Sequence, residues 1–501
     1  MRWFLRAVLA ALAVCPFLTG CAVGPDFRPP APPDAGAYTA TELPTTTAGS
    51  PAAGGAPQRF VPGQDIPEAW WRLFRSEPLD ALIRRAMADS PTVALAQARI
   101  REARENRRAQ FGTLYPRLDA GLGASRQRIS GASLGQPDTG GQSLTLLNAS
   151  LDVSYSPDLF GGTRHQLEAL DMQIAYQRFQ LEGAYLTLTA SIVTTAVKEA
   201  SLVSQIRAVR EIVAVQAKEL EMLERRLQIG GVARTDVLSQ RTQLAQAEAT
   251  LPPLELELEQ TRHQLAVLVG QLPSEAALLE FELDQMSLPE EIPVSVPSSL
   301  VRQRPDIGAA EALLHFASAR VGVATANLYP QVTLTGSLGV LATTPGDLFS
   351  DASTVWRLGA GLLQPLFRGG TLKAQQSAAV ALYDQSLAQY RQTVLESFRN
   401  VADVLRALES DARSLKASAQ AEAIARDTLE VVRRQHEVGA VSYLFLLNAE
   451  RGYREARIGT IRARAARLAD TAALFQALGG GWWNRPGQDL LPSRQAEASG
   501  G

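Results

Sequence analysis

The segment LTLLNASLDVSYS, residues 144–156, alternates between apolar and polar side chains. Leu147 and Leu151 fall on one set of alternate positions, and Asn148 and Asp152 fall on the other. Because successive side chains of a β-strand point to opposite faces, this period of two predicts a strand with one apolar and one polar face. The pattern is typical of strands in membrane barrels, although a half-exposed sheet of a soluble protein shows it as well.

The chain is predicted to contain four such strands, at about 116–127, 144–157, 330–341 and 353–365. Four strands are too few to close a barrel, and open edges in lipid leave backbone groups without hydrogen-bond partners. Two copies would supply about eight strands, whose side chains fill the interior, whereas three would supply about twelve and leave room for a channel. The pattern therefore predicts an oligomer and favours a trimer.

Two halves of the chain match each other at a nearly constant separation. The motif Leu-Tyr-Pro ends at Pro116 in the first half and at Pro330 in the second, and PDLFGG in the first half corresponds to PLFRGG in the second. Further along, residues 225–238 align without gaps with residues 434–447. Ordered matches of this kind predict a structural repeat. We assign the first repeat to residues 68–271, a linker to 272–300 and the second repeat to 301–478.

Each half contains stretches long enough for unusually long helices. No proline lies between Pro157 and Pro252 or between Pro365 and Pro486, and these stretches are rich in Ala, Leu, Gln, Glu and Arg, which favour helices. The predicted helices lie at about 160–229, 233–270, 368–438 and 441–478. Because glycine tolerates the positive φ values that end a helix, the turns are predicted at Gly230, Gly231 and Gly439. A coiled-coil stalk would account for the helices but not for the alternating segments.

The N-terminus has the features of a secretory signal peptide. Arg2 and Arg6 precede an apolar run over residues 7–18, which is shorter than the roughly 20 residues that span a bilayer. The sequence Leu-Thr-Gly-Cys that ends at Cys21 resembles the lipobox of bacterial lipoproteins, in which cleavage precedes the cysteine and its sulfur is acylated. We therefore expect a signal peptide at residues 1–20 and a lipid anchor at Cys21. In bacterial lipoproteins, an aspartate directly after the cysteine favours retention at the inner membrane. Ala22 at this position therefore implies the outer membrane.

The ends of the mature chain are expected to lie outside the folded core. Residues 21–67 are rich in Pro, Ala, Thr and Gly and contain few large apolar side chains. Such a composition cannot bury a core of its own, so we expect an extended tether, with order beginning near Trp70. Residues 479–501 are expected to form a C-terminal tail.

The composition argues against catalytic, metal-binding and nucleic-acid-binding sites. The 501 residues include 49 basic and 51 acidic side chains, so no basic field exists to attract nucleic acid. Loss of residues 1–20 would leave Cys21 as the only cysteine, which excludes an internal disulfide and a cysteine-based metal or redox site. The four histidines are scattered along the chain. No catalytic motif has the context that its chemistry requires, so we expect neither an enzyme nor a cofactor.

Several motifs together resemble one known family. They are GCAVGPDF at 20–27, WWRLF at 70–74, PLDALI at 78–83 and RPDI at 304–307. In this order and spacing they resemble the TolC-like outer-membrane factors, specifically the lipoprotein branch that serves RND-type efflux pumps, the NodT/OprM group. The likeness extends from Cys21 to about Leu478, which is essentially the whole chain after the signal peptide.

The resemblance implies an α+β membrane protein that forms a homotrimer. Each chain would give four strands to a twelve-stranded transmembrane β-barrel, continuous with a twelve-helix periplasmic α-barrel and a mixed equatorial domain, of which the linker at 272–300 would be part. The trimer would be the outer-membrane channel of a tripartite RND-type efflux system, a passive exit duct for drugs or other small molecules. Its partners would be a periplasmic adaptor protein, an inner-membrane RND transporter and outer-membrane lipid. The alternatives are a lipid-anchored periplasmic coiled-coil scaffold without a pore and a protein-secretion conduit.

The resemblance also implies a periplasmic gate beside the helical turns. Leu444 falls on an apolar constriction position, Asn448 falls where relatives usually carry aspartate, and Phe445 occupies a position that is acidic in some of them. Asp236 is retained, but Val441 replaces an arginine that ties the helices together in some members. We therefore expect a more apolar gate, which can block ions by dewetting.

Two points at this gate are left open by the sequence. The partner of Asp236 could be Arg234 or Tyr443 of a neighbouring helix. Leu444 and Phe445 could instead pack between helices without narrowing a channel.

Overall fold

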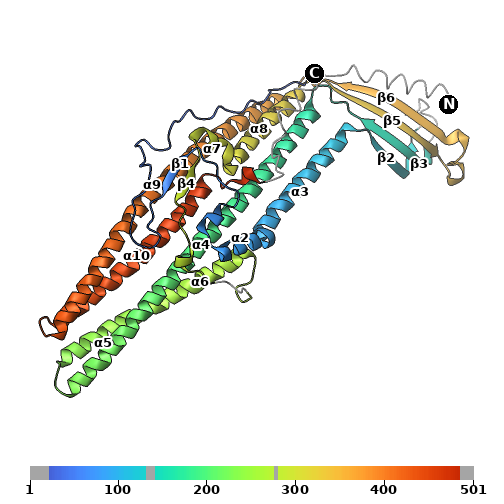
Figure 1. Cartoon of the computed structure of the whole chain (residues 1–501). Helices are drawn as coiled ribbons and strands as arrows, with labels where there is room; N and C mark the ends of the chain where they lie inside the picture. The colour runs from blue at the N-terminus through green and yellow to red at the C-terminus, as the bar shows by residue number, and fades with distance from the viewer. Residues whose placement is uncertain (1–21, 131–140, 276–279, 486–501) are drawn as a thin grey trace. The chain divides into compact units, whose positions relative to one another are not determined.

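The computed structural model describes residues 22–130, 141–275 and 280–485, which form two compact units (Figure 1). The first unit combines the N-terminal segment up to Pro30 with residues 100–176 and 310–390. The second combines residues 31–99, residues 177–309 and the chain from residue 391 onward. Each unit therefore takes its parts from both repeats.

The first unit contains one antiparallel sheet of four strands in the order β2-β3-β5-β6 (Figure 1). The strands are β2 (Arg117–Ile129), β3 (Gln142–Tyr155), β5 (Gln331–Ala342) and β6 (Thr354–Leu363). Leu151 of β3 lies opposite Ala120 of β2 and Leu338 of β5, and Leu338 lies opposite Trp356 of β6. Because directly opposite residues share a face, the apolar positions form one face across the whole sheet.

The other face of the sheet is polar, and its outer strands are open. Asp152 of β3 lies opposite Asp119 of β2 and Ser337 of β5. Within the described residues, β2 and β6 each have a single strand neighbour. The described residues do not cover the apolar face, where Leu122 is 88% exposed. An uncovered apolar surface of this kind marks contact with another protein or with a membrane.

Two helices of 67 residues each, α4 (Gly162–Gln228) and α9 (Thr371–Glu437), are the longest elements. At ~1.5 Å per residue each is about 100 Å long. The other helices are α2 (Glu77–Asp89), α3 (Pro91–Phe111), α5 (Arg234–Glu248), α6 (Leu251–Val269), α7 (Pro297–Gln303), α8 (Pro305–Ala326) and α10 (Tyr443–Ala477). In the part of the chain that the structure describes, α4 alone has the length and apolar composition to cross a membrane. However, 67% of that apolar window is buried, as in a core helix.

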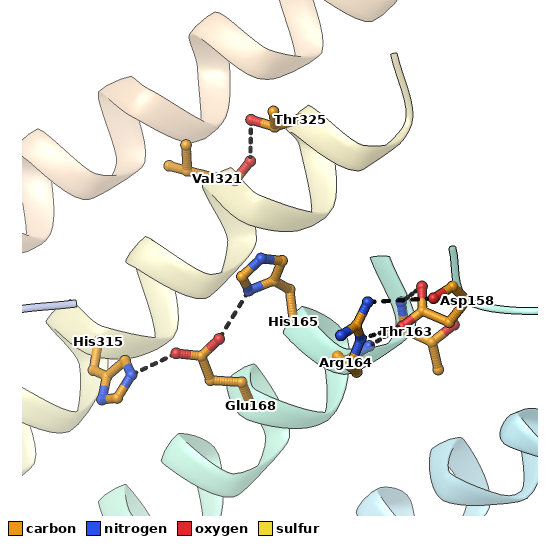
Figure 2. A network of polar contacts seen from close by, with 8 residues as sticks. All are labelled: Asp158, Thr163, Arg164, His165, Glu168, His315, Val321 and Thr325. Atoms are coloured by element: carbon orange, nitrogen blue, oxygen red, sulfur yellow. Dashed lines mark hydrogen bonds and ion pairs between the residues drawn. The ribbon is translucent and has the colours of Figure 1, made fainter. Parts of the chain in front are cut away.

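A polar network fastens the first turns of α4 within the first unit (Figure 2). The carboxylate of Asp158 accepts hydrogen bonds from two backbone N–H groups of the first turn, at 3.1 and 2.9 Å, which caps the helix. Glu168 lies 2.9 Å from Nδ1 of His165 and 2.7 Å from Nε2 of His315 on α8. Burial opposes ionisation of Glu168, but the hydrogen bonds to His315 and His165 outweigh it and lower its pKa.

The main hydrophobic core lies in the second unit. Trp70, in the 3₁₀ turn Trp70–Phe74, is buried and stacks on Phe475 of α10 with 5.2 Å between ring centroids. Ile83 of α2 and Leu283 of the linker pack in the same core. Beside these elements β1 (Arg59–Pro62) and β4 (Glu291–Val294) form a parallel pair. The core thus joins the start of the first repeat, the linker and the last helix.

The expectation that residues 21–67 form a tether, with order beginning near Trp70, is wrong for the described part of that segment. Arg467 of α10 is buried and donates hydrogen bonds to four groups from it. They are the carbonyls of Gly54 (3.1 Å) and Ala56 (2.8 Å) and the side chains of Thr47 (3.0 Å) and Gln58 (3.3 Å). Because a buried guanidinium needs several acceptors, Arg467 orders a segment that has no core of its own.

The single helix expected at 233–270 is two helices. α5 ends at Glu248, and α6 begins at Leu251, directly before Pro252 and Pro253. Proline has no N–H to donate and its ring clashes with the preceding turn, so it is tolerated in the first turn of a helix but not in the interior. The two prolines therefore end one helix and start the next.

Candidate functional site

The two turns that end the long helices are built in the same way. After α4, Gly230 has a φ of +75°, and the N–H of Gly231 donates to the carbonyl of Arg226 at 2.8 Å. After α9, Gly439 has a φ of +77°, and the next N–H donates to the carbonyl of Gln435 at 2.8 Å. Both are Schellman turns, in which a glycine in the left-handed region ends the helix. Of the three predicted turn glycines, Gly231 does not have a positive φ.

A small apolar cluster holds together the region around these turns, which we call the helix tip (residues 216–240 and 429–453). Its buried members come from α4, α5, α9 and α10, and they are Leu223, Val237, Leu429, Tyr443, Leu446 and Leu447. This cluster is much smaller than the core around Trp70. Regions with few buried apolar contacts open at lower cost than the main core, so the helix tip is the part of the second unit best suited to movement.

Leu444, Phe445 and Asn448 lie on the face of α10 that points away from this cluster. All three are exposed, Leu444 and Phe445 by 62% and 61%, whereas Leu446 and Leu447 are buried. Residues four apart share a helix face, so positions 444 and 448 lie together. Leu444 and Phe445 therefore do not pack between helices of their own chain.

Asp236 pairs with neither of the two residues left open by the sequence. Its Oδ2 accepts a hydrogen bond from the backbone N–H of Ala233 at 3.3 Å, at the start of α5. Within the described residues it forms no ion pair with Arg234 and no hydrogen bond with Tyr443. A carboxylate in this place is favourable because the first turn of a helix has unpaired N–H groups.

Tyr443 instead starts a chain of hydrogen bonds across three helices. Its hydroxyl donates to Oε1 of Gln240 on α5 at 2.6 Å, and Nε2 of Gln240 donates to the backbone carbonyl of Gln216 on α4 at 2.9 Å. All three residues are buried. The helix tip is therefore held by a polar connection between α10, α5 and α4 in addition to its apolar cluster.

Sequence reasoning missed a buried pair of carboxyl groups in the helix tip. The side chain of Glu450 on α10 is 6% exposed and that of Glu219 on α4 is 15% exposed. Nη2 of Arg433 on α9 lies 3.7 Å from Oε1 of Glu219 and 3.6 Å from Oε1 of Glu450. A signal was present, because Glu450 follows Leu446 and Leu447 by four and three residues and so shares their buried face.

The pKa values of this pair are raised. Burial and the negative charge of Glu219 raise the pKa of Glu450 to about 8, and Arg433 offsets only part of the effect. Burial also raises the pKa of Glu219. Two carboxyl groups in one buried site do not both ionise readily, because each disfavours the charged form of the other.

Cys21 lies outside the described residues, but the segment that follows it is docked on the first unit. The N–H of Val23 donates to the carbonyl of Phe160 at 3.1 Å. The ring of Phe27 stacks on that of His315, with centroids 4.1 Å apart, and Figure 2 shows His315 bonded to the network on α4. A group attached at Cys21 would therefore be close in sequence to a fixed point of the fold.

The described residues do not form a metal centre. No group of three or more His, Cys, Asp or Glu side chains in residues 22–130, 141–275 and 280–485 is placed to hold a metal ion. The two histidines of Figure 2 are bonded to one glutamate, and the ring of His165 is packed so closely that a Cβ on Gly322 would lie 2.6 Å from it. This network is part of the packing between α4 and α8.

Tyr443→Phe should loosen the helix tip, because it leaves the buried Oε1 of Gln240 without its donor at a cost of about 1–3 kcal/mol. Hydrogen exchange measured by mass spectrometry on the detergent-solubilised protein should show faster exchange in α5 and unchanged exchange around Trp70. Tyr453→Phe is the control, since its ring packs against the same cluster. Equal protection of α5 in the two variants would contradict this role of Tyr443.

Comparisons with known proteins cover both repeats. Residues 82–271 and 296–480 match the family described as outer membrane efflux protein. The pyoverdine export outer membrane protein OpmQ of Pseudomonas putida KT2440 is 32% identical, over 88% of this chain and 94% of that protein. TtgC of the same strain, a probable efflux pump outer membrane protein, is 29% identical over 96% of this chain and 97% of its own.

Solved structures give the same result. The outer membrane protein VceC of Vibrio cholerae matches with a TM-score of 0.76 and 26% identity, over 83% of this chain and 100% of that chain. The fold is therefore that of the TolC-like outer-membrane channels, and the protein is located in the outer membrane. The family match and these likenesses agree with the paired turns, the long helices and the four-stranded sheet. This chain belongs to the outer membrane efflux protein family.

Proposed function

We propose that this chain is the outer-membrane channel component of a tripartite RND-type efflux system and acts as a passive exit duct for drugs or other small molecules. The observation that carries the proposal is the sheet, whose apolar face crosses all four strands and is left uncovered by the part of the chain that the structure describes. Lipid is the natural neighbour of such a face in an outer-membrane protein. The polar face then lines the duct, and energy enters through the transporter at the inner membrane.

The open edges of the sheet support a homotrimer. In the proposed assembly β6 of one copy pairs with β2 of the next, a head-to-tail contact that closes into a ring. Three copies give about twelve strands, enough to leave a channel, whereas two give about eight, whose side chains fill the interior. α4, α5 with α6, α9 and α10 would give four helical rods per chain to a twelve-helix periplasmic tunnel, and the core around Trp70 would form its equatorial domain.

The proposed partners are a periplasmic adaptor protein, an inner-membrane RND transporter and outer-membrane lipid. The relative OpmQ is a pyoverdine export protein, and TtgC is a probable efflux pump protein. These relatives favour a duct for small molecules over a protein-secretion conduit. A coiled-coil scaffold without a pore would have no use for an uncovered apolar sheet, so the sheet argues against that alternative.

The helix tip is the proposed gate of the duct. Leu444 and Phe445 would form its apolar constriction, because they are exposed on α10 and are free to face the other copies. Asn448 shares their face and adds no charge, and Asp236 holds the start of α5 through its backbone contact. An apolar constriction blocks ions by dewetting, so this gate needs no ring of charges.

Leu151→Arg tests the apolar face, because it places a charge at the middle of the sheet, where lipid exposure costs about 2–4 kcal/mol. We expect loss of heat-modifiable oligomers from extracts of the outer membrane, as seen on denaturing gels run with and without boiling. Ser150→Arg alters the adjacent position on the polar face and should leave the oligomers in place. Equal effects of the two changes would contradict a membrane-facing role for this surface.

The gate is tested by the double variant Leu444→Ala with Phe445→Ala, which removes most of the apolar side-chain volume from the constriction. The single-channel conductance in planar bilayers should rise several-fold over wild type. Leu395→Ala, which shortens an exposed side chain on α9, should leave the conductance unchanged. A double variant that conducts no better than wild type rules out a constriction at these residues.

The lipid anchor is proposed at Cys21, and Cys21→Ser should abolish incorporation of labelled palmitate. Cys15→Ser removes the other cysteine, which lies within residues 1–20, and should leave labelling at the wild-type level. Labelling would be followed on gels of the membrane fraction. Labelling that persists in Cys21→Ser would eliminate the anchor while leaving the duct untouched.

A further inference from the structure

Three of the four oxygens of the carboxyl pair Glu219 and Glu450 lack a hydrogen-bond donor among the described residues. Both oxygens of Glu450 and Oε2 of Glu219 are buried without a hydrogen-bond partner among the residues that the structure describes. An ionised carboxylate only accepts hydrogen bonds, so two ionised groups cannot bond to each other, whereas a single proton turns one of them into a donor. A shared proton therefore supplies the missing donor.

The charges around the pair also favour one bound proton. The charged and titratable groups that act on the pair are Arg433 and His436 on α9. Burial raises the pKa of Tyr443 on α10, and the nearby charges of the pair and of Asp236 on α5 raise it further. The hydroxyl of Tyr443 donates its hydrogen bond to Gln240, so it is not a donor to the two carboxyl groups. With one proton on the pair, the charge of Arg433 balances the remaining carboxylate. Loss of that proton leaves a buried excess of negative charge, which is costly.

We propose that Glu219 and Glu450 share one proton and that this proton is a pH-sensitive latch that joins α4 to α10 in the helix tip. When the proton leaves to solvent in alkaline solution, repulsion between the two carboxylates separates the helices. Glu450 lies within two turns of Leu444 and Phe445 on α10. An effect of the latch on conductance rests on the proposed gate, whereas the latch itself is a matter of helix packing.

The direction of the effect follows from the raised pKa of Glu450. The closed helix tip retains the proton up to a pKa of about 8, whereas an opened tip exposes a glutamate with the ordinary pKa of 4.5. The stability that the proton contributes is complete below about pH 4.5, falls as the pH rises between these values, and is lost above about pH 8. One proton changes the opening equilibrium by up to about tenfold per pH unit in that interval.

The test is hydrogen exchange of the whole detergent-solubilised protein at pH 6, 7, 8 and 9, corrected for the intrinsic effect of pH on exchange. In wild type, protection of residues 443–453 should fall by up to about tenfold per unit until about pH 8 and then level off. Glu450→Gln replaces the acid by a neutral donor and should give a flat profile. Glu221→Gln removes an exposed glutamate of α4 that pairs with Arg225 and should behave as wild type.

Glu219→Gln provides a second variant in case Glu450→Gln folds poorly, and it should also flatten the profile. A flat wild-type profile, or a wild-type profile in a well-folded glutamine variant, overturns the latch. Single-channel conductance over the same pH range separates the latch from the gate. Conductance that rises with the loss of protection supports both, whereas constant conductance with changing protection supports the latch and overturns its control of the gate.

Discussion

The unpaired edges of a four-stranded sheet are the constraint on which the rest of this molecule depends. β2 and β6 each present a row of backbone N–H and C=O groups without a strand neighbour in the described part of the chain. In hydrocarbon each such group costs several kcal/mol. The apolar face of the sheet is stable in lipid, whereas its unpaired edges are not. The sheet can therefore lie in a membrane only when further strands pair with both edges. In the proposed trimer, assembly is therefore the last step of folding and not an addition to it.

The parts of the fold that the sequence predicts are those decided by short-range patterns. Leu151 and Asp152 fall on opposite faces of β3, and the residues opposite them on β2 and β5 agree in polarity. The alternation is readable because a shift of one residue would exchange the two faces. Gly230 and Gly439 are equally local, because a helix that ends in a left-handed residue favours glycine at that position.

The features that the sequence did not reveal are pairings between distant residues. Nothing in the polar segment around Thr47 indicates that Arg467 will need its oxygen atoms, because that need depends on where α10 lies. The carboxyl pair is an intermediate case. The position of Glu450 on the apolar face of α10 predicts that its side chain is buried. No pattern in the sequence indicates that Glu219 of α4 is its partner. Pro252 indicates the break between α5 and α6, but the helical pattern over residues 233–270 predicts a single helix.

The contact between Arg467 and the N-terminal segment has a consequence for biogenesis. Its hydrogen bond to Thr47 joins residues 420 positions apart, and Trp70 stacks on Phe475 near the other end of the chain. A polypeptide exported N-terminus first cannot complete either contact until its last helix has crossed the inner membrane. Contacts this far apart in sequence form slowly and leave apolar surface exposed in the meantime. The newly exported chain therefore keeps part of the apolar surface of its main core exposed throughout that interval.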